Sequence, residues 1–145
     1  MKKEKNYGLT IDERILILFF MFMGLYELSR AFYWLSDFNL VKYDSGLYFT
    51  LAEIVPLYIW AVPFLVSGIL LIMAGFYSVK KSNKTFYIIL MTSSFFATLG
   101  HAMLTMASIN NGISVLTPLQ NFTLTMLFLS ILVVGGDSLW KRKKK

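Results

Sequence analysis

The stretch TFYIILMTSSFFATLGHAMLTMASINNGISVLTPLQNFTLTMLFLSILVVGG, residues 85–136, decides the fold. It contains no Asp, Glu, Lys or Arg, and it is about twice as long as the roughly 20 residues that one helix needs to cross a bilayer. The helix breakers Asn110-Asn111-Gly112 and Thr117-Pro118 divide it. We therefore predict two membrane-spanning helices, at 85–109 and 118–140, joined by a polar but uncharged turn.

Two further spans are predicted upstream, at 13–35 and 57–79. Thr10 and Glu13 have the spacing of a capping box, in which each residue satisfies a backbone N–H of the other at the start of a helix. No charged residue lies between Glu53 and Lys80, which marks the second span. The intervening segment 37–54 has apolar residues at helical spacing near its end, which predicts a short interfacial helix in the first outer loop.

Composition agrees with a lipid environment. Of the 145 residues, 57% are hydrophobic and 15% charged, whereas soluble domains carry about 25% charged residues. The whole chain, 1–145, is thus predicted to be a single all-α domain, a four-helix transmembrane bundle. Trp34, Trp60 and Trp140 fall near the predicted helix ends, where aromatic residues anchor membrane proteins. We interpret the Met and Phe residues as lipid-facing bulk.

Basic residues indicate the orientation. Eleven of the 14 Lys and Arg residues flank the spans on one side, whereas the segment 36–54 has a single lysine and three acidic residues. Because positive charge collects in cytoplasmic segments, both termini are predicted to be cytoplasmic. The eleven residues are Lys2, Lys3, Lys5, Lys80, Lys81, Lys84, Lys141, Arg142, Lys143, Lys144 and Lys145.

The C-terminal five of these, Lys141 to Lys145, are predicted to attract anionic lipid headgroups. We expect Asp137 to be neutralised by Lys141, one helical turn later. The membrane is predicted to be the plasma (inner) membrane. The alternative is the endoplasmic reticulum, because Lys141-x-Lys143 resembles a dilysine retrieval signal. The frequent Lys, Asn and Ile residues are typical of a low-GC bacterium or its phage.

Several chemistries are excluded by composition. A chain without Cys forms no disulfide and no thiolate metal site, and the single His101 rules out a bis-histidine haem or a multi-histidine zinc site. We expect no metal and no cofactor. No phosphate-binding loop or nucleophile elbow is visible, so we predict no enzymatic activity. We expect no nucleic-acid partner, because the clusters of basic residues each flank an apolar span.

Glu27 and Arg30 are the sharpest anomaly, because ionisable groups in a membrane helix are costly and usually face the bundle interior. At about 1.5 Å of rise per residue, Glu27 lies about 18 Å above Ile15 and Arg30 about 22 Å above it. His101 lies about 22 Å above Phe86 by the same rise, so all three share one depth.

Two polar stripes accompany these residues. Ser94, Thr98, His101, Thr105 and Ser108 recur every three or four residues on the third helix. Gln120, Thr123, Ser130 and Asp137, at spacings of three, seven and seven, share one face of the fourth. We expect both stripes to converge inside the bundle and to form a polar pocket open to the outside. Its predicted lining, and the set of ligand or proton candidates, is Glu27, Arg30, Thr98, His101, Gln120 and Asn121.

Purely structural roles can also account for these polar residues. Glu27 and Arg30, at i and i+3, can neutralise one another as a structural pair, or Arg30 can extend to the outer surface. His101 can be a packing histidine, and the hydroxyls can serve interhelical hydrogen bonds rather than a conduction path.

The second span offers helix-packing residues. Pro63 should kink the helix, and Gly68 and Gly75, seven apart, leave a smooth face that a neighbouring helix can approach closely.

Two functional hypotheses follow. The first is a non-enzymatic protein that packs against a membrane-protein partner or itself, in an accessory, immunity, exclusion or holin-like role. The second is a small transporter, channel or proton-responsive sensor that uses Glu27, Arg30 and His101.

Overall fold

The computed structural model describes residues 9–36, 46–78, 84–110 and 115–143. These residues are almost entirely helical and include no strand. Four of the helices are long and apolar enough to span a membrane, which confirms the predicted all-α fold with four spans. The helices are α1 (Ile11–Ser36), α3 (Gly46–Ile54), α4 (Leu57–Tyr77), α5 (Lys84–Asn110) and α6 (Leu116–Lys143).

Local interactions at the helix ends follow the sequence. The N–H of Glu13 donates to Thr10 Oγ1 at 3.3 Å, and the N–H of Thr10 donates to Glu13 Oε2 at 2.9 Å, so the capping box is confirmed. In the last turns of α6, Lys141 Nζ lies 2.6 Å from Asp137 Oδ2 with both side chains exposed. The predicted pairing of these two residues is therefore confirmed.

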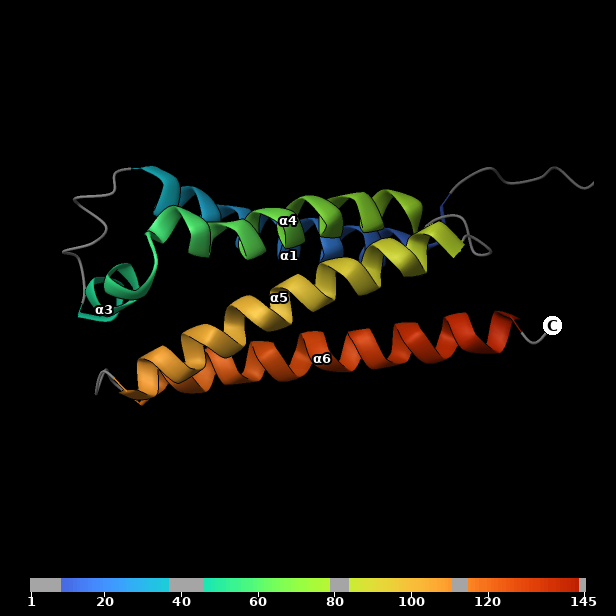
Figure 1. The fold of residues 1–145 in the computed structure, drawn as a ribbon. Helices are drawn as coiled ribbons and strands as arrows, with labels where there is room; N and C mark the ends of the chain where they lie inside the picture. The colour runs from blue at the N-terminus through green and yellow to red at the C-terminus, as the bar shows by residue number, and fades with distance from the viewer. Residues whose placement is uncertain (1–8, 37–45, 79–83, 111–114, 144–145) are drawn as a thin grey trace, which may run out of the picture.

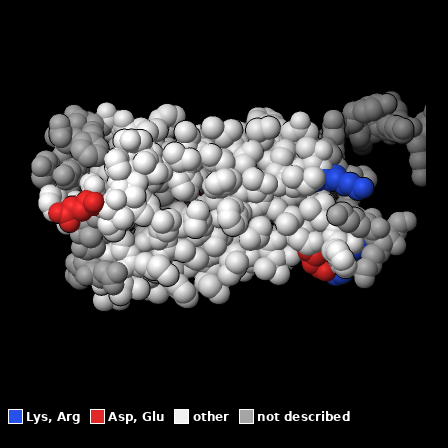
Figure 2. Space-filling model, in the orientation of Figure 1, with Lys and Arg blue, Asp and Glu red and all other residues white. Residues whose placement is uncertain are grey.

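The long helices pack in the order α1, α4, α5, α6. The most extensive contacts are between α1 and α4, between α5 and α6, and between α4 and α5, so α1 and α6 are the outer members of the series. In Figure 1 the start of α1 and the end of α6 lie at one end of the bundle and α3 lies at the other. On the face shown in Figure 2, the coloured charged side chains lie at the two ends and the band between them is uncharged.

The glycine face of α4 is occupied by α1. A Cβ atom on Gly68 would lie 2.9 Å from the carbonyl oxygen of Gly24, and one on Gly24 would lie 2.8 Å from that of Gly68. Gly75 also faces α1, near the carbonyl of Ile17. Close approach at Gly68 and Gly75 was expected from the sequence, but the neighbour is a helix of the same chain. The helix α4 runs from Leu57 to Tyr77 without interruption at Pro63.

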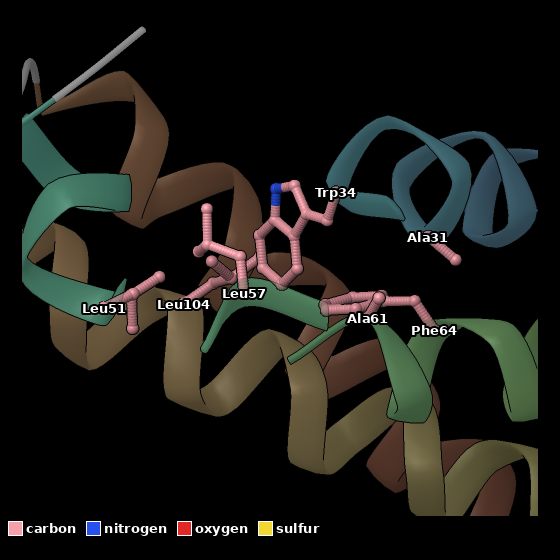
Figure 3. Close-up of a cluster of buried hydrophobic side chains, with 7 residues drawn as sticks. All are labelled: Ala31, Trp34, Leu51, Leu57, Ala61, Phe64 and Leu104. Atoms are coloured by element: carbon pink, nitrogen blue, oxygen red, sulfur yellow. The ribbon is translucent and has the colours of Figure 1, made fainter. Parts of the chain in front are cut away.

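A hydrophobic cluster fills the end of the bundle nearest α3 (Figure 3). Trp34 is 3% exposed and its indole projects from α1 into this cluster, so its predicted role as a lipid-interface anchor is wrong. The ring is surrounded by apolar side chains from α3, α4 and α5 and thus belongs to the core. The cluster consists of Ala31, Trp34, Leu51, Leu57, Ala61, Phe64 and Leu104.

Several predictions concern residues outside the described ranges. These include most of the basic residues, namely Lys2, Lys3, Lys5, Lys80, Lys81, Lys144 and Lys145, and the first part of the outer loop, 37–45. The helix α3 occupies the second part of that loop, and Leu51 on α3 contributes to the core.

Candidate functional site

A buried pair of ionisable side chains lies at the centre of the bundle. Glu27 on α1 and His101 on α5 have no exposed side-chain surface, and Glu27 Oε1 lies 2.9 Å from His101 Nε2. The buried residues of α1 are Phe20, Gly24, Glu27, Ala31 and Trp34, at alternating spacings of four and three. Glu27 therefore belongs to the face with which α1 packs on its neighbours. Its second oxygen, Oε2, accepts from Ser67 Oγ of α4 at 3.3 Å.

Asn121 of α6 connects this pair to Arg30. Its Oδ1 lies 3.1 Å from His101 Nδ1 and accepts from Arg30 Nη1 at 2.8 Å. Its Nδ2 donates to the carbonyl of Thr117 at 3.0 Å. Arg30 Nη2 in turn donates to the hydroxyl of Tyr26 at 2.8 Å. One hydrogen-bonded network thus joins side chains from all four long helices.

The donors and acceptors of this network determine which nitrogen of His101 carries a hydrogen. Arg30 has only donors and the Thr117 carbonyl only accepts, so the Asn121 amide can point in only one direction. Its Oδ1 therefore accepts from His101, and Nδ1 of His101 must carry a hydrogen. The short contact between Glu27 and His101 Nε2 then requires one further proton between them. The pair is either carboxylate with imidazolium or carboxylic acid with imidazole, and it is neutral as a unit in both forms.

Aromatic rings enclose His101. Its ring stacks on Tyr26 and Phe128, with interplanar angles of 12° and 10°, and the ring of Phe64 lies edge-on at 5.3 Å between centroids. A Cβ on Gly100 would lie 2.8 Å from the Phe64 ring, so the glycine makes room for it.

The guanidinium of Arg30 lies over two of the same rings, 5.4 Å from the centre of Tyr26 and 5.5 Å from that of Phe64. Its hydrogen-bond partners, Asn121 and Tyr26, are neutral. The local pair that the i and i+3 spacing suggested, Glu27 with Arg30, is thus replaced by pairing of Glu27 with a residue 74 positions away. The reason is that α1 points Glu27 into the bundle, whereas Arg30 lies at the edge of the buried face and is half-buried.

No family model matches the chain, and no curated protein or solved structure is significantly similar to it. The site is therefore interpreted from its own geometry. Within the described residues, no group of three or more His, Asp or Glu side chains is placed to hold a metal ion.

The polar stripe of α6 does not converge on the site as we expected. Gln120, Thr123, Ser130 and Asp137 are all exposed, and Asn121 is the α6 residue that reaches the network. The hydroxyls of Thr123 and Ser130 donate to the carbonyls of Leu119 and Met126, four residues earlier in their own helix. Because these hydroxyls are satisfied locally, they can face outward.

The stripe of α5 divides into two parts. Thr105 and Ser108 donate to the carbonyls four residues earlier. In contrast, the hydroxyl oxygens of Ser94 and Thr98 are buried and have no hydrogen-bond partner among the described residues. Thr98 is one turn from His101 and Ser94 one turn further, so a column of polar atoms extends from the site along α5.

Sequence reasoning missed several residues of the site. Tyr26 had a local signal, because it lies four residues before Arg30 on one helix, the spacing at which side chains meet. Gly100 is adjacent to His101. Ser67, Phe64 and Phe128 offered no signal that distinguishes them from other residues of a membrane helix, and the interpretation of Phe as lipid-facing is wrong for the buried Phe20, Phe64 and Phe128.

Proposed function

We propose that this chain is a small non-enzymatic membrane protein in which the Glu27–His101 pair acts as a proton-responsive element that controls helix packing. The observation that carries the proposal is the 2.9 Å contact between Glu27 Oε1 and His101 Nε2, two fully buried side chains, from which we infer that they share one proton. Buried ionisable groups in membrane helices commonly serve proton relays and switches.

Release of the shared proton to water would break one of two interhelical contacts. The remaining hydrogen of the neutral imidazole can stay on Nδ1, which preserves the bond to Asn121 but turns the Nε2 lone pair toward the Glu27 carboxylate. It can instead move to Nε2, which preserves the bond to Glu27 but leaves two acceptors facing each other at Asn121. The first outcome weakens the contact between α5 and α1, and the second weakens the contact between α5 and α6.

The sign of the response follows from this proton count. The network is complete while the proton is shared, so we expect the tighter arrangement at lower pH and loosening as pH rises. The hydroxyls of Thr98 and Ser94, which have no hydrogen-bond partner among the described residues, support the proposal, because buried hydroxyls beside the site can relay a proton by accepting and donating hydrogen bonds.

The test is a distance measurement across the network. The chain has no Cys, so spin labels can be attached at Leu35→Cys on α1 and Leu116→Cys on α6, where both side chains are exposed. In liposomes examined from about pH 5 to about pH 9, the distance distribution should broaden as pH rises. Glu27→Gln and His101→Gln should abolish the change.

The matched control is Asp137→Asn, which converts a carboxyl to an amide in the exposed pair with Lys141. It should leave the pH response unchanged. A distance distribution that does not depend on pH in the unmodified network, or a response that persists in His101→Gln, would reject the proposal.

Proton translocation is a stronger form of the same function. It can be measured as proton flux into liposomes that contain the protein. Flux that the double substitution Glu27→Gln, His101→Ala leaves unchanged would reject translocation through this site.

We retain helix packing with a membrane partner as a second candidate. The supporting observation is that α6 is the least buried of the four long helices. The face that first suggested a partner, around Gly68 and Gly75, no longer supports it because α1 occupies that face. Crosslinking from Leu129 and Val133, which are exposed on α6, should capture a defined neighbour. A protein that remains monomeric and uncrosslinked in its native membrane would count against this candidate.

We also propose that both termini face the cytoplasm and that the membrane is the plasma membrane, with Lys141 to Lys145 near anionic headgroups. The support is the distribution of Lys and Arg along the sequence. The start of α1 and the end of α6 lie at one end of the bundle, as this orientation requires (Figure 1).

A further inference from the structure

A groove runs between the two outer helices of the series. Beside the buried network it has a volume of about 640 Å³ and is lined by α1 and α6. A second hollow of about 410 Å³ follows along the same two helices toward their other end, where α5 forms its floor. The lining of the first hollow is Met23, Tyr26, Leu119, Gln120, Thr123 and Leu124.

The polarity of the groove changes along its length. Its first part contains the side chains of Tyr26, Gln120 and Thr123. The second part is lined almost wholly by apolar side chains, such as Leu16 and Val134. Across the two hollows the lining of α6 extends from Leu119 to Gly135, which is about 24 Å at about 1.5 Å of rise per residue. The groove is thus longer than half of the roughly 30 Å hydrocarbon core.

Arg30 places a positive charge at the polar end. The hydroxyl of Tyr26 accepts a hydrogen bond from Arg30, and the side chain of Tyr26 lines the groove. Gln120, which is adjacent in sequence to Asn121, also lines it. Glu27 is paired with His101, and the two hydrogen-bond partners of Arg30, Asn121 and Tyr26, are neutral. The charge of Arg30 is therefore not balanced by an acidic residue in the described part of the chain.

We propose that this groove binds an anionic phospholipid of the surrounding bilayer. The phosphate lies at Arg30 and the Gln120 amide, and an acyl chain follows the apolar part between α1 and α6. Charge complementarity selects the anionic headgroup. Two hollows of about 640 and 410 Å³ along the same pair of helices suit a flexible acyl chain.

Lipid retention tests this inference. The detergent-solubilised protein is equilibrated at one pH with equal amounts of phosphatidylglycerol and phosphatidylcholine, and the lipids that remain bound are counted by native mass spectrometry. We expect phosphatidylglycerol to be retained about fivefold over phosphatidylcholine, the factor that one cationic group near an anionic headgroup provides. Arg30→Met should bring the ratio close to one.

The chain offers a matched control in Arg14, an exposed arginine on α1 near its other end. Arg14→Met makes the same change of charge and should keep the preference. The C-terminal lysines are present in both variants, so their contribution cancels in the comparison. Equal preference in the two variants would overturn the proposal.

Two further variants keep the test decisive if Arg30→Met does not fold. Gln120 is exposed, so Gln120→Leu should fold and lower the preference, and Leu124→Trp should fill the groove and lower the retention of both lipids. Unchanged lipid counts in both folded variants, or a lipid-free dimer that fills the groove with a second copy, would overturn the proposal. A retained lipid preference together with distances that do not depend on pH would reject the proton-responsive function alone.

Discussion

Glu27 and His101 meet on two different helices, with Glu27 Oε1 2.9 Å from His101 Nε2 and 74 positions of sequence between them. Neither side chain has exposed surface, so the pair is out of contact with bulk water. We propose that the position of α1 relative to α5 depends on the protonation of this pair.

Loss of one member of the pair should be costly. Glu27→Ala leaves a buried imidazolium, or a buried donor, without its partner and should lower the free energy of unfolding by about 3–5 kcal/mol. Unfolding by sodium dodecyl sulfate in mixed micelles measures this change. Asp137→Ala, in the exposed pair with Lys141, should cost less than about 1 kcal/mol. Equal losses in the two variants would contradict the structure.

Asn121 tests the direction of the hydrogen bonds. It accepts from both His101 and Arg30, so Asn121→Asp retains both accepted bonds, whereas Asn121→Leu leaves two donors unsatisfied at about 1–3 kcal/mol each. We expect the Asp variant to be clearly more stable than the Leu variant in thermal unfolding. The reverse order would mean that Nδ1 of His101 does not donate to residue 121.

The glycines of α4 should differ in their tolerance of alanine. At Gly68 the added Cβ would lie 2.8 Å from Leu28 Cγ and 2.9 Å from a backbone oxygen of α1, and such overpacking costs about 1–3 kcal/mol. At Gly75 the nearest atom would be 3.4 Å away, and alanine is the better helix former by about 1 kcal/mol. Gly68→Ala should therefore destabilise, and Gly75→Ala should be neutral or stabilising, in the same unfolding assay.

Two tryptophans should respond differently to replacement by phenylalanine. The indole nitrogen of Trp60 donates to the carbonyls of Leu51 and Val55, at 3.1 and 2.9 Å, and so ties the end of α3 to α4. The indole nitrogen of Trp34 is buried without a hydrogen-bond partner among the described residues. Trp60→Phe should increase hydrogen exchange in α3. Trp34→Phe should leave it nearly unchanged, because no hydrogen bond is lost.

The membrane topology is testable without purification. Carbonate washing should leave the protein in membrane vesicles, since four apolar helices hold it there. A reporter fused after Lys145 should report a cytoplasmic location, and one inserted after Ser45 the opposite side. Release by carbonate, or an external reporter after Lys145, would contradict the proposed arrangement.

Local sequence signals predicted local structure well. The uncharged stretch and its breakers predicted two of the long helices, and the spacing of Thr10 and Glu13 predicted a real capping box. The pairing of Asp137 with Lys141 is likewise a contact between neighbouring turns of one helix. Such contacts depend only on the spacing of two residues along one helix, which can be read directly from the sequence.

Contacts between helices could not be predicted in the same way, because they depend on how each helix is rotated about its axis. Glu27, Arg30 and His101 were expected at one depth, and the network does join them through Asn121. The i and i+3 spacing offered Arg30 as one partner of Glu27, whereas the structure pairs Glu27 with His101. For α6, the three-and-four spacing identified a common face but not its direction, because Thr123 and Ser130 satisfy their hydroxyls within the helix.

The stacking of His101 between Tyr26 and Phe128 has a spectroscopic consequence. Ring currents from two parallel faces should shift the imidazole carbon-bound protons to higher field than those of a free histidine. His101 is the only histidine in the chain, so these resonances need no assignment. Nuclear magnetic resonance of protein labelled only at histidine would then follow one ring inside the bundle and identify which of its nitrogens carries hydrogen.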